Sequence, residues 1–168
     1  MTTIAGNLQQ VRARIATACR AAGRGVEEVT LLAVCKTFGA DAVRQAFEAG
    51  QRAFGENYVQ EAVEKIAALA DLRAQLAWHC IGPIQSNKTR LVAEQFDWAH
   101  TVDRLKIAER LSAQRPPELP PLNVCIQVNI DGGLSKSGVA PGEALPLARA
   151  VAALPNLKLR GLMTIPEI

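Results

Sequence analysis

Lys36 directly follows the apolar segment 29–35, which has the composition of a buried β-strand. Because side chains alternate along a strand, Leu32, Val34 and Lys36 share one face. If that face points into the protein interior, the Lys36 amine lies at the interior end of the strand, where loss of hydration favours an uncharged amine. A free amine attacks aldehydes to form Schiff bases. From position alone, a lysine whose ammonium simply reaches water fits equally well.

Predicted strands alternate with predicted helices along the whole chain. The first element is a helix whose apolar stripe runs from Ile4 to Ala22 and which ends at Gly23 and Gly25. The predicted strands are residues 29–35, 52–55, 76–81, 97–101, 122–130 and 157–163. The predicted helices between them are residues 40–49, 58–70, 87–95, 103–114 and 141–154, with Asp103 as the cap of the fourth. Most strand starts are about two dozen residues apart, the length of one βα unit, which predicts a parallel sheet.

Two architectures fit this alternation, a doubly wound open sheet and a (β/α)8 barrel. The segment after the first strand, Cys35–Gly39, contains no glycine-rich phosphate loop of the kind an open sheet carries. Polar side chains instead follow almost every strand, and they are Lys36, Glu56, Asn57, His79, His100, Thr101, Asn129 and Thr164. A barrel gathers such strand ends around one mouth, where its active site lies. The sequence therefore predicts an α/β fold, a (β/α)8 TIM-type barrel with an N-terminal helix, with about six of its strands in this chain.

Composition and charge exclude several classes of function. The formal net charge of +3 and the scattered aromatic residues give no case for nucleic-acid binding. No apolar run is long enough to span a membrane, and the first residues lack the regions of a signal peptide, so we expect a cytoplasmic protein. The cysteines have no metal-ligand spacing and are expected to be reduced thiols; they are Cys19, Cys35, Cys80 and Cys125. We expect no metal, and a monomer, since no apolar face is left over.

Several segments resemble the pyridoxal phosphate homeostasis proteins. They are Leu32–Thr37, Phe54–Glu61, Trp78–Lys88, His100–Arg104, Gln127–Ile130, Ser135–Gly138 and Arg160–Met163. Their order and spacing match from the first predicted strand to the end of the chain, and together they are highly specific. Cys35 and Gly39 stand where members of that family often have serine and proline, and neither change removes the Lys36 amine.

The resemblance implies a fold and a cofactor. Members resemble the barrel domain of alanine racemases and hold pyridoxal 5'-phosphate (PLP) as an aldimine on the lysine that follows the first strand, here Lys36. They buffer the cofactor and deliver it, with no established enzymatic reaction. Our leading hypothesis is therefore a non-catalytic carrier that takes part in intracellular PLP homeostasis and passes the cofactor to PLP-dependent apo-enzymes.

Three further residues are candidates for binding the cofactor. Asn57 could hydrogen-bond the ring or its hydroxyl, or cap the helix that follows. His79 could lie over the ring, or be a hydrogen-bonded histidine of the core. Met163 could touch the ring, or fill the core. Lys136, in a glycine- and serine-rich loop, is a second amine that could visit the mouth, although a solvated loop lysine is the commoner role.

Two other hypotheses use the same lysine. A PLP-dependent amino-acid racemase or lyase would need a second base opposite Lys36. Related racemases take a tyrosine from an added β-domain, whereas the one tyrosine here is Tyr58, beside Asn57. A barrel that forms Schiff bases with sugar phosphates, as aldolases do, would not need the motifs beyond Lys36.

The chain is shorter than a complete barrel domain, which usually takes roughly 200–250 residues and closes with eight strands. Six parallel strands would leave two edges unpaired. We therefore expect the 168 residues to be part of a longer protein, as one barrel domain (1–168) without strands seven and eight. The resemblance places phosphate-binding serines, a glycine-threonine turn and an arginine near the ring nitrogen in that further part.

Overall fold

The computed structural model describes residues 3–133 and 137–167 and contains one six-stranded parallel sheet. The strands are β1 (Ala33–Val34), β2 (Ala53–Glu56), β3 (Ala77–Cys80), β4 (Trp98–Val102), β5 (Leu122–Gln127) and β6 (Leu157–Met163). They lie side by side in chain order, β1 to β6. In a doubly wound sheet the spatial order of the strands reverses beside the first strand, whereas in a barrel each new strand is added beside the previous one. The strand order thus confirms the predicted barrel type.

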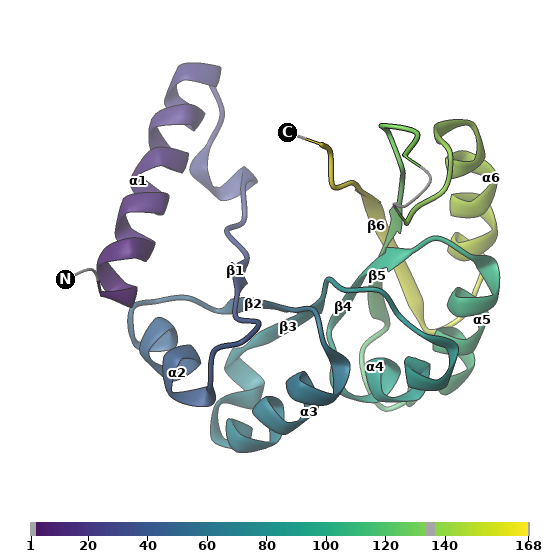
Figure 1. The fold of residues 1–168 in the computed structure, drawn as a ribbon, viewed down its shortest axis with the longest axis horizontal. Helices are drawn as coiled ribbons and strands as arrows, with labels where there is room; N and C mark the ends of the chain where they lie inside the picture. Colours follow the sequence, from purple (N-terminus) through teal and green to yellow (C-terminus); the bar gives the residue numbers. More distant parts are fainter. Residues whose placement is uncertain (1–2, 134–136, 168) are drawn as a thin grey trace.

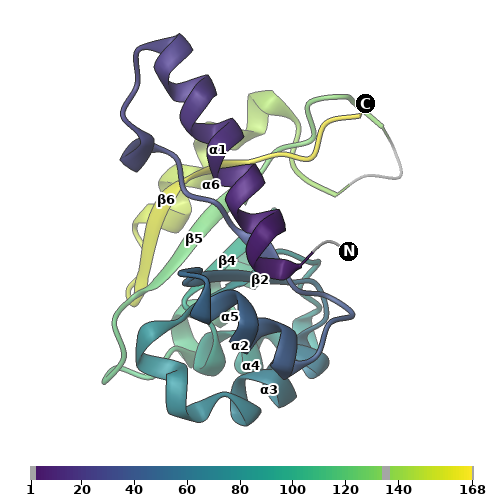
Figure 2. The ribbon, with the colours of Figure 1, turned by 90° about the vertical axis from the view of Figure 1, so that its left-hand side faces the viewer.

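The helices cover the outer face of the curved sheet. They are α1 (Ile4–Ala22), α2 (Ala40–Glu48), α3 (Val59–Ala68), α4 (Thr89–Gln95), α5 (Leu105–Gln114) and α6 (Pro141–Ala152), with short 3-10 helices at Val26–Glu28, Ala70–Gln75 and Ser86–Lys88. Figure 1 shows α2 to α6 along the convex side and α1 at the β1 end of the sheet. The perpendicular view in Figure 2 shows α2 to α5 gathered on one side of the strands. None of the helices in the described ranges is long and apolar enough to cross a membrane.

The main core lies between the sheet and these helices. Phe54 of β2 and Trp78 of β3 are fully buried there, with ring centroids 5.9 Å apart. Because side chains alternate along a strand, His79 faces the other, concave side of the sheet. The sequence predicted this layering, since outward positions of the strands are apolar while polar residues follow the strand ends.

β1 is much shorter than the predicted strand 29–35, and that prediction is wrong. The Gln51 carboxamide lies where a backbone ladder would continue, and its Nε2 donates to the carbonyl oxygens of Leu31 (2.7 Å) and Ala53 (2.9 Å). A side chain thus replaces strand pairing at the start of β1. The predicted fifth strand is also too long, because β5 ends at Gln127 and Val128 forms an isolated bridge to Val139.

The prediction that Asp103 caps the fourth helix is wrong as well. The cap of α5 is Arg104, which makes no side-chain capping bond. The Asp103 carboxylate instead accepts the backbone N–H of Gly138 at 3.0 Å. Asp103 therefore ties the end of β4 to the loop that follows β5, a tertiary contact that local sequence does not reveal.

Candidate functional site

Lys36 lies in a tight turn directly after β1. The N–H of Phe38 donates to the carbonyl oxygen of Cys35 at 3.1 Å, which closes a β-turn with Lys36 and Thr37 at its centre. The Lys36 side chain is exposed, so the expected loss of hydration is not found. Thr37 has a φ of 69°, in the left-handed region that β-branched residues rarely adopt. Such strain costs of order 1–3 kcal/mol and is concentrated at functional sites.

The Cys35 thiol, next to Lys36, is buried and faces the core. Its Sγ donates to Oε1 of Glu56 at 2.8 Å. Burial raises the pKa of the Cys35 thiol, and the hydrogen bond to the Glu56 carboxylate raises it further. The thiol therefore stays protonated and unreactive, as the sequence analysis expected of a reduced core cysteine.

A cavity of about 180 Å³, lined by both polar and apolar side chains, opens at the carboxyl ends of the strands. It is lined by Asn57, Ile81, Pro83, Thr101, Gln127, Val128, Asn129, Ser137 and Ile165. These residues follow β2 and β3, end β4, or follow β5 and β6, so the structure gathers strand-end side chains as a barrel mouth does. Three of the predicted polar residues are among them, namely Asn57, Thr101 and Asn129.

Asn57 has an unsatisfied acceptor in this cavity. Its Oδ1 is buried and has no hydrogen-bond partner within the described part of the chain. The alternative role of helix cap is wrong, because the cap of α3 is Tyr58 and no side-chain capping bond is present. A buried carbonyl oxygen without a donor is unfavourable, so Asn57 suits a ligand that carries a hydroxyl or N–H donor.

Lys36 and Asn57 lie at the same end of neighbouring strands. Val34 of β1 is opposite Gly55 of β2 in the parallel register. Lys36 lies two residues beyond Val34 and Asn57 two residues beyond Gly55, so each follows the carboxyl end of its strand. The unsatisfied Asn57 acceptor lines the cavity, whereas Lys36 lies in the turn after the neighbouring strand and is not among the residues that line it.

His79 does not line the cavity but forms a pair with His100 on the concave face. Its Nδ1 is 2.9 Å from Nε2 of His100, and its ring stacks on Trp98 with centroids 5.0 Å apart. Burial lowers the pKa of His79 to about 4, and the neighbouring His100 adds to this effect. Of the two roles weighed for His79, the geometry favours the hydrogen-bonded core histidine. Within residues 3–133 and 137–167, no three His, Cys, Asp or Glu side chains form a metal-binding group.

This pair predicts a loss of stability in mild acid. The pKa of His79 is below its ordinary 6.5 in the folded protein, so the folded state binds the proton less readily than the unfolded chain. The stability held by neutral His79 is present above about pH 6.5 and is lost as pH falls toward 4. From pH 7.5 to pH 5, we expect His79 to account for a loss of about 2 kcal/mol in the free energy of unfolding.

Urea titrations at several pH values measure this loss. In His79→Gln, the new carboxamide can still bond His100 but does not titrate. The free energy of unfolding of this variant should therefore depend less on pH over this range. An equally steep dependence in His79→Gln would assign the acid sensitivity to other groups, such as His100, whose pKa burial also lowers.

Met163 and Lys136 complete the predicted site residues. Met163 ends β6 opposite Gln127, and its carbonyl oxygen accepts the N–H of Val128 at 2.8 Å. Gln127 and Val128 both line the cavity, so Met163 is adjacent to the cavity without lining it. Lys136 lies outside the described residues.

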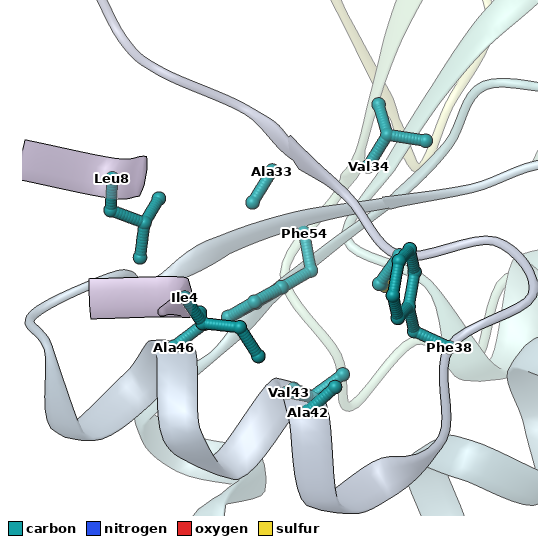
Figure 3. A pocket seen from close by; sticks show the side chains of 10 residues that line it. Ile4, Leu8, Ala33, Val34, Phe38, Ala42, Val43, Ala46 and Phe54 are labelled. Atoms are coloured by element: carbon teal, nitrogen blue, oxygen red, sulfur yellow. The ribbon is translucent and has the colours of Figure 1, made fainter. Parts of the chain in front are cut away.

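A separate apolar pocket of about 130 Å³ lies between α1, β1 and α2. Figure 3 shows its lining, with Ile4 and Leu8 of α1 facing Val43 and Ala46 of α2, and Phe38 at one side. Its lining is almost entirely hydrocarbon, so it lacks the polar groups that orient a cofactor. The monomeric state remains a prediction.

Gly82 is a residue that the sequence analysis missed. It follows β3, and a Cβ added there would lie 2.1 Å from the carbonyl oxygen of Asn57. Its own carbonyl oxygen accepts the Thr101 hydroxyl at 2.7 Å. Only glycine lets the chain after β3 approach Asn57 this closely. The Gly82-Pro83 dipeptide signalled a tight loop, although it could not reveal which backbone the loop meets.

Comparison with known proteins first defines the class. A family model described as "Alanine racemase, N-terminal domain" matches residues 6–167. The crystal structure of an alanine racemase from E. faecalis has a TM-score of 0.64 and 22% sequence identity, covering 91% of this chain and 41% of the racemase. At that identity the likeness shows the fold alone. The protein is thus a barrel of the alanine racemase N-terminal type.

More similar proteins define the family within that class. Proteins named "Pyridoxal phosphate homeostasis protein" from Pseudomonas aeruginosa and Escherichia coli K12 are 64% and 60% identical to the chain, each over 99% of it and over 72% and 71% of their own lengths. The structure of PipY from Synechococcus elongatus, with PLP bound, has a TM-score of 0.82 and 38% identity, covering 98% of this chain and 71% of PipY. The chain belongs to the pyridoxal phosphate homeostasis protein family, which confirms the resemblance found in its motifs.

Proposed function

We propose that this protein binds PLP through a reversible covalent bond to Lys36 and acts as a non-catalytic carrier in PLP homeostasis. One observation carries the proposal: the exposed Lys36 and Asn57 follow the carboxyl ends of neighbouring strands, and Asn57, with its unsatisfied Oδ1, lines a cavity at that end of the sheet. The names of its relatives and the PLP bound in PipY support it. The proposal includes delivery to apo-enzymes, in the cytoplasm, by a monomer.

The residues fit the chemistry of the cofactor. Lys36 would hold PLP through its amine, and the aldehyde of PLP would supply the carbon for a C=N bond, with loss of one water. The reaction reverses when water returns, which suits a carrier. Asn57 Oδ1 can accept the hydroxyl of the pyridine ring, which satisfies the buried acceptor. The Thr101 hydroxyl already donates to Gly82 at 2.7 Å and therefore shapes the wall.

The second candidate function is a PLP-dependent racemase or lyase. Its fold is that of alanine racemases, and a racemase needs a second base. Tyr58 caps α3 and is 60% exposed, so it does not stand over the cavity. The names of the relatives favour the carrier.

Reduction of the loaded protein with borohydride tests the proposal. Hydride converts the C=N bond to a stable secondary amine, and peptide mapping locates it. We expect the label on Lys36, and we expect Lys36→Ala to lose essentially all of it while keeping its melting temperature, because an exposed side chain leaves no cavity. Lys106→Ala, an exposed lysine of α5, is the matched control and should label normally.

Two outcomes contradict this proposal. Label on another lysine with Lys36 unmodified would remove Lys36 from the site. Multiple turnovers of an L-amino acid by the loaded protein, followed by chirality and keto-acid release and absent in Lys36→Ala, would favour the enzyme.

A further inference from the structure

A buried ion pair lies beneath the turn that carries Lys36. Glu56 is 0% exposed and Lys65 is 6% exposed. Nζ of Lys65 is 2.5 Å from Oε1 of Glu56. Two charges removed from water gain little or no net stability over an apolar pair of the same size. A buried pair at this position therefore calls for a role besides stabilising the fold.

The Lys65 ammonium also holds the backbone in front of Lys36. Nζ donates to the carbonyl oxygen of Cys35 at 2.7 Å. That oxygen belongs to the peptide group between Cys35 and Lys36, and it also accepts the N–H of Phe38 that closes the turn. Because a charge-assisted hydrogen bond is directional and strong, it fixes the plane of this peptide group.

Glu61 holds the backbone behind Lys36. It lies one turn before Lys65 on α3, and its Oε1 is 3.5 Å from the Lys65 ammonium. The same oxygen accepts the N–H of Thr37 at 3.1 Å. Thr37 is the residue with the unfavourable φ of 69°, so the Glu61 carboxylate helps to keep it there. Charged groups of one helix thus fix both peptide groups that flank Lys36.

We propose that Glu61 and Lys65, supported by Glu56, are positioning residues that direct the Lys36 side chain toward the incoming aldehyde. They act on the backbone of the turn. This inference rests on the proposed function, since it assigns to Lys36 the amine that bonds the cofactor. When the turn is fixed, the Lys36 amine is already close to the position from which it can attack the aldehyde when PLP arrives. With the turn loose, the same amine is present and exposed, and it captures PLP more slowly.

Glu61 offers the cleanest test, because its side chain is 39% exposed and its removal leaves the core intact. Mixing each protein with PLP, quenching with borohydride at intervals and mapping the label gives the rate of capture at Lys36. Glu61→Ala loses the hydrogen bond from the Thr37 N–H to a charged group, so we expect its rate of capture at Lys36 to be about ten-fold lower. Glu61→Gln should recover most of the rate, because its carboxamide oxygen can still accept the Thr37 N–H.

Glu64→Ala is the matched control. Glu64 is an exposed acidic residue of the same helix, so its removal changes the charge of α3 without touching the turn, and it should capture PLP at the normal rate. Melting temperatures of the variants should agree within a few degrees. Slow capture by Glu61→Ala with rescue by Glu61→Gln supports a positioning role, which a loss of folding would not produce.

Failure of the positioning role and failure of the proposed function give different results. If the unmodified protein gives no label on Lys36, the proposed function is wrong. If it labels at Lys36 but Glu61→Ala captures PLP equally fast, the positioning role is wrong and the function stands. Equal slowing by Glu64→Ala, or no rescue by Glu61→Gln, also overturns it, because a general charge effect would then explain the rates.

Discussion

Lys65→Met is expected to lower the free energy of unfolding by about 3–5 kcal/mol. The substitution keeps the length and the apolar stem of the side chain but leaves the Glu56 carboxylate buried without its cation. Among the residues that the structure describes, the Cys35 thiol at 2.8 Å is then the one remaining donor to Oε1. Equilibrium unfolding in guanidinium chloride measures the change, provided that the free energy of unfolding falls with denaturant concentration at the same slope in both proteins.

Two further variants separate the ion pair from other effects of this substitution. Lys106→Met changes an exposed lysine of α5 and should alter stability by less than about 0.5 kcal/mol. Glu56→Gln combined with Lys65→Met removes both charges, so the double variant should be more stable than Lys65→Met alone. If Lys65→Met is as stable as the original protein, the unpaired Glu56 carboxylate does not destabilise the fold.

Gly82→Ala is expected to destabilise the protein by about 1–3 kcal/mol and to weaken PLP binding. The added Cβ would lie 2.1 Å from the Asn57 carbonyl oxygen and 2.8 Å from its carbonyl carbon. Both are backbone atoms, so relief requires the loops after β2 and β3 to separate. That separation moves Asn57 and also disturbs the bond from Thr101 to Gly82. Thermal unfolding and titration with PLP measure the two effects.

Gly142→Ala is the matched control for this substitution. Gly142 lies in the first turn of α6, where an added Cβ meets no atom within 4 Å. Because alanine favours a helix over glycine, this variant should be unchanged or up to about 1 kcal/mol more stable. If Gly82→Ala has the stability and PLP affinity of the original protein, the close approach of the two loops is not a constraint on the site.

The barrel and part of its mouth follow from sequence patterns alone. The alternation of apolar segments with amphipathic helices predicted the six parallel strands that the structure contains. Polar residues at strand ends predicted that Asn57, Thr101 and Asn129 would meet, and all three line the cavity. These predictions succeeded because the period of a strand or helix and the topology of a barrel are enough to determine them.

The remaining features depend on contacts between residues far apart in the chain. A lysine within an amphipathic helix normally reaches water, and nothing local to Lys65 reveals that Glu56 and the Cys35 carbonyl group surround it. The length of β1 could not be predicted either, because the Gln51 side chain replaces ladder bonds that an apolar segment would otherwise form. His79 and His100 likewise meet only through the register of β3 and β4.

The short pairing of β1 has a consequence for motion in the native state. In the described part of the chain, the ladder joins β2 to Ala33 and Val34 alone, with one further bond from the Cys35 N–H to the carbonyl oxygen of Gly55. Segments with few ladder bonds open locally at free energies well below that of global unfolding. Opening of β1 would need the Gln51 amide to release the carbonyl group of Leu31 and the Lys65 ammonium to release that of Cys35, while the β3–β6 part of the sheet stays paired. Amide hydrogens of residues 29–38 should then exchange with solvent sooner than those of β4 and β5. Under the proposed carrier function, opening of the segment that bears the amine would let a recipient protein reach a cofactor bound there without unfolding the carrier.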